Sequence, residues 1–388
     1  MKTQASLIVA AVLFCAALSA LAGRDVWQKI ALDKTHVVFL TKDPARASTL
    51  YAATALGVLK SLDSGANWSK LGAFLPSDIQ AAAIAINPRN SRELYVGYDG
   101  RGLFKSLDGG ENWQAANEGL PNLSVRCIAI SPQDPNLLYL GISGGVAIST
   151  NGGKFWQMSS GFKRAINVNA LVIDPKNPQY LYAGTGGAGV FKSGNGGVSW
   201  KDVNQGLSSL SITSLHIDPE NPDILLAGAY HPASPTDLYV GQASGGVFRS
   251  QDGGRSWQGS SLLNIHIFSF AASPAYPDTV YAGAWGGIYR STDKGLNWTD
   301  INAGLDNAFP HTLHVVSDNP LTLLAGTTFG LLSYTDDSLN APRKGDEGRT
   351  SLILYGLGVS AALALLFGFQ YLRQRAKRKT RDAPQSVW

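Results

Sequence analysis

The chain has 388 residues, a formal net charge of +4, 44% hydrophobic residues and two cysteines. Residues 373–388 contribute +5 to that charge and Lys2 contributes +1, which leaves −2 for the rest and excludes a charge-driven nucleic-acid-binding surface there. Cys15 lies in an apolar N-terminal segment and Cys127 in an apolar run, so a disulfide-stapled scaffold is excluded as well.

The N-terminal segment has the features of an export signal. Residues 5–22 are apolar, follow Lys2 and end in Ala20, Leu21 and Ala22. A basic residue, an apolar stretch and a small-x-small site are typical of a secretory signal peptide, which we place at residues 1–22. An uncleaved N-terminal anchor is the alternative.

One short pattern, S-x-D/N-x-G-x-x-W, occurs six times between residues 61 and 298, and a worn seventh copy begins at Ser333. Most copies start 41 to 45 residues after the previous one, and one interval is 57 residues long. A period of about 40–45 residues with strand-like content is typical of propeller blades. We therefore expect residues 23–337 to form an all-β domain, a seven-bladed β-propeller of four-stranded antiparallel blades.

Each repeat has the same internal order. A first apolar run ends at a proline, which lacks an N–H and stops a strand. A second run such as 94–97, a glycine-bearing turn and a third run such as 189–193 follow, and the S-x-D/N turn then leads into a fourth strand at the Trp. The seven prolines are Pro44, Pro88, Pro132, Pro175, Pro219, Pro274 and Pro320.

The residues of the repeated turn suit a folding role. Ser, Asp and Asn side chains accept hydrogen bonds from nearby backbone N–H groups, glycine supplies positive φ, and the Trp buries a large ring. The pattern resembles the Asp-box, or bacterial neuraminidase repeat. We assign a structural role to Ser61, Asp63, Gly65, Trp68, Ser106, Asp108, Gly110, Trp113, Asn151, Trp156, Asn195, Trp200, Asp252, Trp257, Asp293 and Trp298.

The seventh repeat lacks one strand. It has runs at 312–317, 323–326 and 330–333 but no Trp after its turn, whereas residues 26–30 contain Trp27 ahead of any repeat. We expect residues 26–30 to be the outer strand of the seventh blade, which would close the ring and leave no open sheet edge.

The C-terminal part predicts a membrane anchor. Residues 338–350 are polar with Pro342, Gly345 and Gly348, as in a linker. Residues 351–372 are apolar and long enough to span a bilayer, and six basic residues follow in the tail 373–388. The positive-inside rule places that tail in the cytoplasm, so we expect a single-pass cell-membrane protein with its propeller on the extracytoplasmic side.

Candidate binding residues lie in the turns that join second to third strands, on the face opposite the S-x-D/N turns. Most of these turns are small, and the fifth repeat carries an insertion, residues 230–244, within its 57-residue interval. A neutral insertion is the alternative to a contact site. The candidates are Tyr98, Asp99, Arg101, Tyr230, His231, Asp237, Tyr239, Trp285 and Phe329.

No metal or cofactor is expected. Five of the six histidines lie in or near first strands, but none has a zinc-type spacing and no cysteine joins them. The sequence has no G-x-S-x-G nucleophile motif and no phosphate loop.

The repeat at 181–200 resembles those of the photosystem II assembly and stability factors, which are single seven-bladed propellers. This implies a role in binding protein partners in or at the membrane. The chain differs in its C-terminal apolar segment and in having no arginine-rich cluster in the propeller, so we carry over the broader role of an assembly platform for membrane proteins or envelope partners. The alternative is a glycoside hydrolase, similar to sialidase or xyloglucanase propellers and acting on extracellular glycans; no pair of carboxyls is singled out for it.

Overall fold

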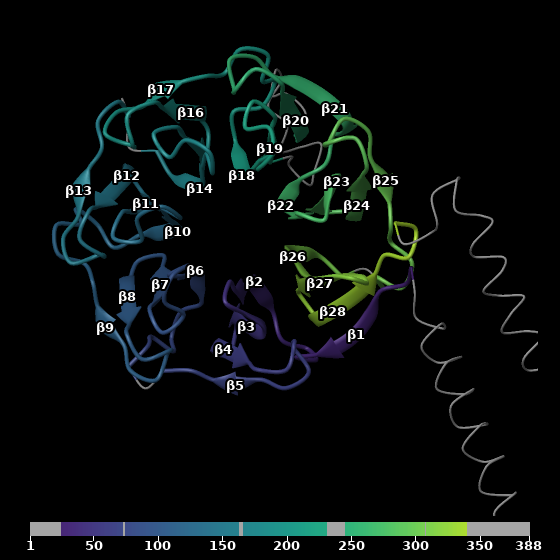
Figure 1. The fold of residues 1–388 in the computed structure, drawn as a ribbon, viewed down its shortest axis with the longest axis horizontal. Helices are drawn as coiled ribbons and strands as arrows, with labels where there is room; N and C mark the ends of the chain where they lie inside the picture. The colour runs from purple at the N-terminus through teal and green to yellow at the C-terminus, as the bar shows by residue number, and fades with distance from the viewer. Residues whose placement is uncertain (1–24, 73, 163–165, 231–244, 307, 340–388) are drawn as a thin grey trace, which may run out of the picture. The chain divides into compact units, whose positions relative to one another are not determined.

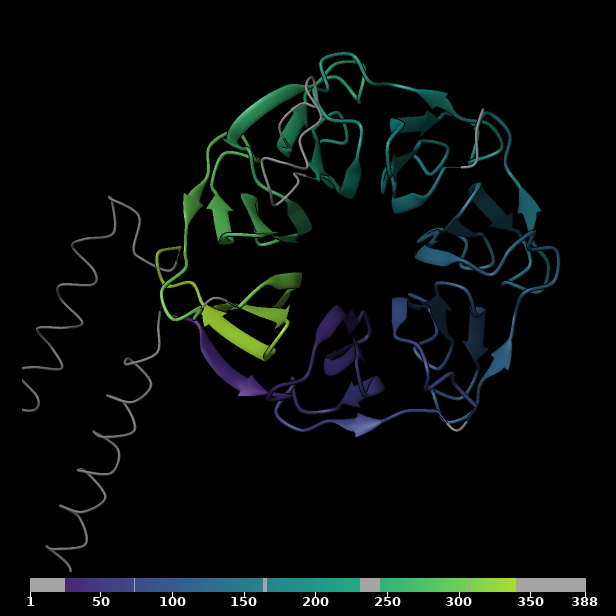
Figure 2. The same ribbon diagram turned by 180° about the vertical axis from the view of Figure 1, so that it is seen from behind.

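The computed structural model describes residues 25–72, 74–162, 166–230, 245–306 and 308–339. Within this part, seven four-stranded antiparallel sheets form a ring (Figures 1 and 2). The prediction of an all-β, seven-bladed propeller is therefore confirmed. The expected signal peptide (1–22) and membrane segment (351–372) lie outside the described residues, among which no helix is long and apolar enough to cross a membrane.

The strands of the first six blades follow in chain order from the centre outward, and in the seventh the outer strand is β1 from the start of the domain. The inner strands are β2 (Val37–Asp43), β6 (Ala81–Ile86), β10 (Val125–Ile130), β14 (Val168–Ile173), β18 (Ile212–Ile217), β22 (Ile267–Ser273) and β26 (Pro310–Asp318). The second strands are β3 (Arg46–Thr54), β7 (Leu94–Tyr98), β11 (Leu138–Ile142), β15 (Leu181–Thr185), β19 (Leu225–Ala229), β23 (Tyr276–Ala284) and β27 (Leu321–Thr327). The third strands are β4 (Gly57–Ser61), β8 (Gly102–Ser106), β12 (Gly145–Ser149), β16 (Gly189–Ser193), β20 (Gly246–Ser250), β24 (Gly287–Ser291) and β28 (Gly330–Thr335). The outer strands are β5 (Ser69–Lys70), β9 (Gln114–Ala115), β13 (Gln157–Met158), β17 (Lys201–Asp202), β21 (Gln258–Leu263), β25 (Thr299–Asp300) and β1 (Gln28–Ala31).

The two ends of the domain meet in the seventh blade. Strand β1 pairs antiparallel with β28, with Gln28 opposite Ser333. The strand starts two residues later than the predicted 26–30 because in every blade the Trp directly precedes the outer strand. Trp27 is buried, stacks on Tyr334 at 5.0 Å and donates from its indole N–H to the Ile301 carbonyl at 2.8 Å.

The repeated S-x-D/N-x-G-x-x-W turns, called box turns below, share one hydrogen-bond pattern. In the first, the Ser61 hydroxyl accepts from the Gly65 N–H at 2.9 Å and donates to Asp63 at 2.8 Å, while Asp63 accepts from the Asn67 backbone N–H at 2.8 Å. Those hydrogen bonds, first that from the Asn67 backbone, lower the pKa of Asp63 to about 2. Gly65 has a φ of +95°, which favours glycine there.

Neighbouring blades are joined at these turns. Tyr95 and Lys105 of the second blade both donate to the carbonyl of Gly152 in the next box turn, at 3.1 and 2.8 Å. In the worn seventh turn the fully buried Asp336 takes this part, accepting from the Tyr281 hydroxyl at 2.6 Å and from the Arg290 guanidinium at 2.8 Å.

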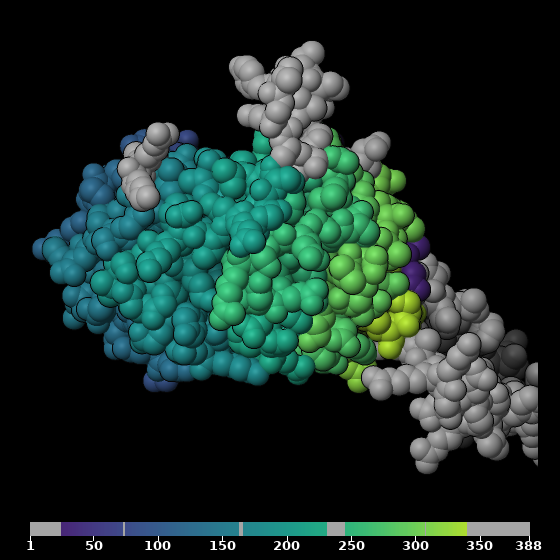
Figure 3. Space-filling model, turned by 90° about the horizontal axis from the view of Figure 1, so that it is seen from above, coloured from purple at the N-terminus to yellow at the C-terminus, as the bar shows by residue number. Residues whose placement is uncertain are grey.

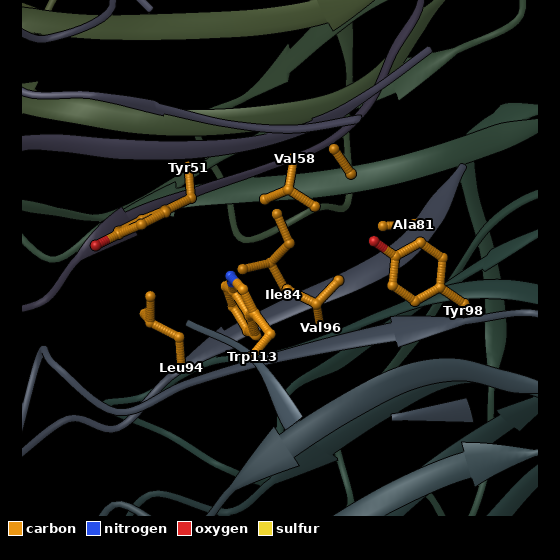
Figure 4. Close-up of a cluster of buried hydrophobic side chains, with 9 residues drawn as sticks. Tyr51, Val58, Ala81, Ile84, Leu94, Val96, Tyr98 and Trp113 are labelled. Atoms are coloured by element: carbon orange, nitrogen blue, oxygen red, sulfur yellow. The ribbon is translucent and has the colours of Figure 1, made fainter. Parts of the chain in front are cut away.

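The core lies between adjacent blades. Figure 4 shows one such cluster, in which Tyr51 and Val58 of the first blade pack toward Ile84, Val96 and Trp113 of the second. Seen from the edge, blades from teal to green form a continuous surface (Figure 3). The strands thus form a rigid scaffold, and function is expected in the turns and the channel.

Candidate binding face

The two faces of the propeller carry different turns. Because consecutive strands are antiparallel, the turns between second and third strands and the N-terminal ends of the inner strands lie on one face, called the loop face. The box turns and the proline turns after the inner strands lie on the other, called the box face. Figures 1 and 2 show the propeller from its two sides.

A central channel runs between the inner strands. A cavity of about 410 Å³ is lined by residues from all seven of them. The second residue of each inner strand contributes to this lining, and equivalent positions carry different chemistry: Val38, Ala82, Arg126, Asn169, Thr213, Phe268 and His311.

Blades 5, 6, 7 and 1 place a continuous set of rings at the loop-face end of the channel. His266 lies 4.9 Å from Tyr230 and 4.3 Å from Phe268 between ring centroids. His311 lies 5.0 Å from Phe268 and 4.6 Å from His36. Trp285 lies 6.3 Å from Phe268 and 4.8 Å from Phe309. We call these seven residues the aromatic arc: His36, Tyr230, His266, Phe268, Trp285, Phe309 and His311.

The loop-face turns of the same four blades expose apolar side chains. Tyr230, Trp285 and Phe329 are 42, 49 and 52% exposed, and Leu56 of the first blade is 58% exposed. Trp285 also borders a cavity of about 440 Å³ together with Phe309. Half-exposed rings packed on partly buried ones form a surface that can accept the side chains of a ligand.

Two histidines of the arc, His36 and His311, are held uncharged near neutral pH. Burial, together with the nearby His36 and His266, lowers the pKa of His311 to about 4, and burial also lowers the pKa of His36. The Nε2 atom of His36 is buried and has no hydrogen-bond partner among the described residues. Within that part of the chain no group of three or more His, Cys, Asp or Glu is placed to hold a metal ion.

Blades 2 to 4 have a polar loop face whose groups bind one another. Asp99 pairs with Arg126 at 2.9 Å and accepts a hydrogen bond from Ser124, while Ser143 donates to Asn167 at 2.7 Å. Arg101 pairs with Asp78. The buried Nε of Arg126 is an exception, having no partner among the residues described. We call this set the polar arc: Asp78, Asp99, Arg101, Ser124, Arg126, Ser143 and Asn167.

The structure separates the residues singled out from the sequence. Trp285 and Tyr230 belong to the aromatic arc, and Phe329 is exposed beside it in blade 7. Asp99 and Arg101 lie in the polar arc, and each is held in an ion pair. The remaining insertion candidates, His231, Asp237 and Tyr239, lie outside the described residues.

Tyr98 was wrongly expected at the surface. It is the last residue of β7, a strand whose five residues are all buried, and it is 1% exposed. Its ring packs edge-on against Phe104 at 5.7 Å, and burial raises the pKa of its hydroxyl. Tyr98 therefore supports the turn that carries Asp99 and Arg101 and does not contact a ligand at the surface.

Five residues of the arc were not predicted as a site: His36, His266, Phe268, Phe309 and His311. The signal is visible only when the seven repeats are aligned. The residue before the inner strand is an aromatic or imidazole ring in blades 6, 7 and 1, but Gln80, Ser124, Asn167 and Ser211 in blades 2 to 5.

No protein-family model matches the sequence, and no curated protein matches it. Solved structures match by fold. A structure described as YCF48 bound to D1 peptide superposes with a TM-score of 0.60 at 17% identity, over 81% of this chain and 97% of that one.

Two glycoside hydrolases also match. An ancestral GH74 enzyme has a TM-score of 0.63 at 24% identity, over 78% of this chain and 45% of the enzyme, and a GH74 enzyme from Niastella koreensis has a TM-score of 0.59 at 19% identity, over 76% and 51%. The chain thus spans about half the length of these enzymes. At such identities the likeness shows the shared propeller fold and carries no activity with it.

Proposed function

We propose that this propeller is a protein-binding module that captures a segment of a partner on its aromatic arc and acts as a platform for assembling membrane-protein complexes. The observation that carries the proposal is the run of four neighbouring blades whose loop-face turns expose Leu56, Tyr230, Trp285 and Phe329 around partly buried rings. Exposed aromatic side chains with a packed base are typical anchors of protein interfaces.

An extended segment fits the spacing of this surface. The exposed side chains come from successive blades around the channel mouth, and cavities of about 440 and 410 Å³ lie beside them. Each residue of an extended chain advances about 3.3 Å, so a short segment would reach several blades. The YCF48 structure, described as bound to a D1 peptide, is a propeller of this fold with a peptide ligand and supports a peptide ligand here.

The proposal includes the anchor expected from the sequence. Residues 351–372 would span the membrane, with the propeller on the extracytoplasmic side and residues 373–388 in the cytoplasm. Protease added to cells with a permeable outer envelope should then remove the propeller and spare a tag after Trp388. A protected propeller would show the opposite orientation.

The glycoside hydrolase alternative has less support from the loop face. That chemistry requires two carboxyl groups about 5–10 Å apart across the sugar. Asp78 and Asp99 are each tied to an arginine, and Asp306 lies with Trp285 at a cavity of blades 6 and 7. Release of reducing sugar from xyloglucan or of sialic acid by the purified chain, lost in Asp306→Asn, would favour the enzyme.

Photo-crosslinking tests the binding proposal with a matched pair of positions. Leu56 lies in a loop-face turn and is 58% exposed, and Leu107 lies in a box turn and is 57% exposed. With a benzophenone amino acid at position 56, the full chain should crosslink a defined membrane protein in native membranes. The same probe at position 107 should not. Crosslinking of the same protein from position 107 alone would place the contact on the box face and contradict the proposal.

A further inference from the structure

A second cavity lies at the opposite end of the channel from the aromatic arc. Its volume is about 610 Å³, and it is lined by the C-terminal halves of the inner strands of blades 4 to 7 and by the proline turns that follow them. We call it the lower cavity. A volume in this range suits a small organic ligand.

Two residues that line the lower cavity differ in type from the residues at equivalent positions of the other blades. The fifth residue of the inner strand is small or aliphatic in five blades but is His216 in blade 5 and His314 in blade 7. Blade 6 lies between them and contributes Ala271 and Ala272, whose short side chains leave room, while Phe270 supplies a ring 6.4 Å from that of His216.

The lining is mostly apolar, and its polar groups are two uncharged imidazoles, the Ser273 hydroxyl and Glu220. Burial lowers the pKa of both His216 and His314 to about 4, with a smaller contribution from the charge of Lys42 at His314. Each neutral ring can donate one hydrogen bond and accept one. Neither ring makes a hydrogen bond to another described residue. Glu220 is exposed at the open end.

The lining of the lower cavity limits the charge and the shape of the ligands that it can bind. An anion would lose hydration without gaining a positive charge from the lining, which is unfavourable. A flat ring can pack on Phe270 and on the prolines at the opening, Pro175, Pro219, Pro274 and Pro277, and a polar atom on its edge can pair with an imidazole.

We propose that the lower cavity binds an uncharged aromatic group of one or two rings that carries a hydrogen-bonding N–H or O–H, with His216 and His314 as its polar partners. This site is separate from partner capture on the aromatic arc. The ring can come from a free small molecule or from a Trp or Tyr side chain of a protein.

Equilibrium dialysis of the full chain with radiolabelled indole and phenol tests the proposal. Binding is expected with a Kd on the order of 1 mM or below, and benzoate, which has a similar ring but a charge, should bind at least about ten-fold more weakly. N-acetyltryptophanamide distinguishes the sources. If it binds as tightly as indole, a protein side chain fits the site, and if it does not, a free small molecule does.

Variants locate the binding. Ala271→Leu fills the cavity and should reduce indole affinity by at least about ten-fold. The matched control is Ala129→Leu, the same change at the same strand position in blade 3, outside the lining. His216→Leu and His314→Leu should each weaken indole while leaving near-UV circular dichroism unchanged.

Two results would overturn the proposal. One is the absence of indole and phenol binding at about 10 mM with a folded chain. The other is binding that Ala271→Leu and the histidine variants leave unchanged, or that Ala129→Leu weakens as much as Ala271→Leu does.

Discussion

The box turns and the loop-face turns belong to the same repeats, but the box turns are similar in sequence from blade to blade and the loop-face turns are not. Six box turns keep the Ser, an Asp or Asn, the Gly and the Trp, and the Gly N–H donates to the Ser hydroxyl at 2.9 Å in each, as at Ser61, Ser106 and Ser250. The loop-face turns range from Gly186-Gly187 to exposed Trp285. A residue type that is the same at equivalent positions of the repeats is one that the fold needs in every blade. A residue type that differs between the repeats is free to serve another role, such as binding.

The largest effect on stability is expected where the box pattern fails. Asp336→Ala removes the buried carboxylate that accepts hydrogen bonds from both Tyr281 and Arg290, and it breaks the ion pair of that carboxylate with the Arg290 guanidinium. Breaking a buried ion pair costs about 3–5 kcal/mol. Chemical denaturation should show this loss, whereas Asp337→Ala, one residue further and only partly buried, should lower the free energy of unfolding less.

Closure of the ring gives a similar or slightly smaller effect. Trp27→Ala removes a buried indole that stacks on Tyr334 and bonds to the Ile301 carbonyl. Large-to-small core changes of this kind cost roughly 3–5 kcal/mol, and the mostly exposed strand β1 that follows Trp27 can relax, so the low end is expected. A melting temperature equal to that of the unmodified chain would mean that β1 does not hold the seventh blade.

Substitutions on the loop face should weaken partner binding and leave stability largely unchanged. Trp285→Ala removes a half-exposed ring and should weaken capture of the crosslinked partner by about 2 kcal/mol or more, roughly 30-fold in Kd. Arg101→Ala is the control from the polar arc, because its ion pair with Asp78 is exposed to solvent and contributes little to stability. Equal losses from both variants would remove the distinction between the two arcs.

Deleting the insertion in the fifth repeat also tests whether the loop face serves binding rather than folding. Replacing residues 231–244 by a Gly-Gly turn should leave the fold intact, because neighbouring blades manage with such a turn. We expect partner affinity to fall by about 2 kcal/mol if the insertion carries contact residues. Thermal unfolding and titration with the partner would separate the two effects, and unchanged affinity would mark the insertion as neutral.

The smallest effect concerns acid stability in the box turns. The folded pKa of Asp63 is about 2, below its usual value near 4 in an unfolded chain. Its stabilising contribution is therefore present above about pH 4 and is lost as the pH falls toward 2. Asp63→Asn should flatten the fall in stability over that window and keep the turn, as Asn151 does in the third blade. A pH profile that is unchanged would contradict this.

The sequence predicted the architecture well because the box turn is a local device with a fixed spacing, and counting Trp residues identified the closing segment at Trp27. It could not show that Asp336 replaces the missing turn, since Tyr281 and Arg290 reach it from another blade. Tyr98 was wrongly assigned to the turn because it directly precedes the exposed residues Asp99 and Arg101, although it is the last residue of a buried strand.

The aromatic arc could not be predicted from the sequence for a similar reason. Its contacts join residues as distant as His36 and His311, which become neighbours only when the ring closes. Periodicity gives the blades, but which equivalent positions carry rings becomes meaningful only once the blades are in order around the channel.

Hydrogen–deuterium exchange of the full chain with and without its crosslinked partner tests the central claim most directly. Partner binding should slow exchange at the loop-face segments of blades 5 to 1, around His36, Tyr230, Trp285 and Phe309, and leave the box turns at 61–68 and 106–113 unchanged. Slowed exchange confined to the box turns, or to the polar arc around Asp99 and Ser143, would contradict it.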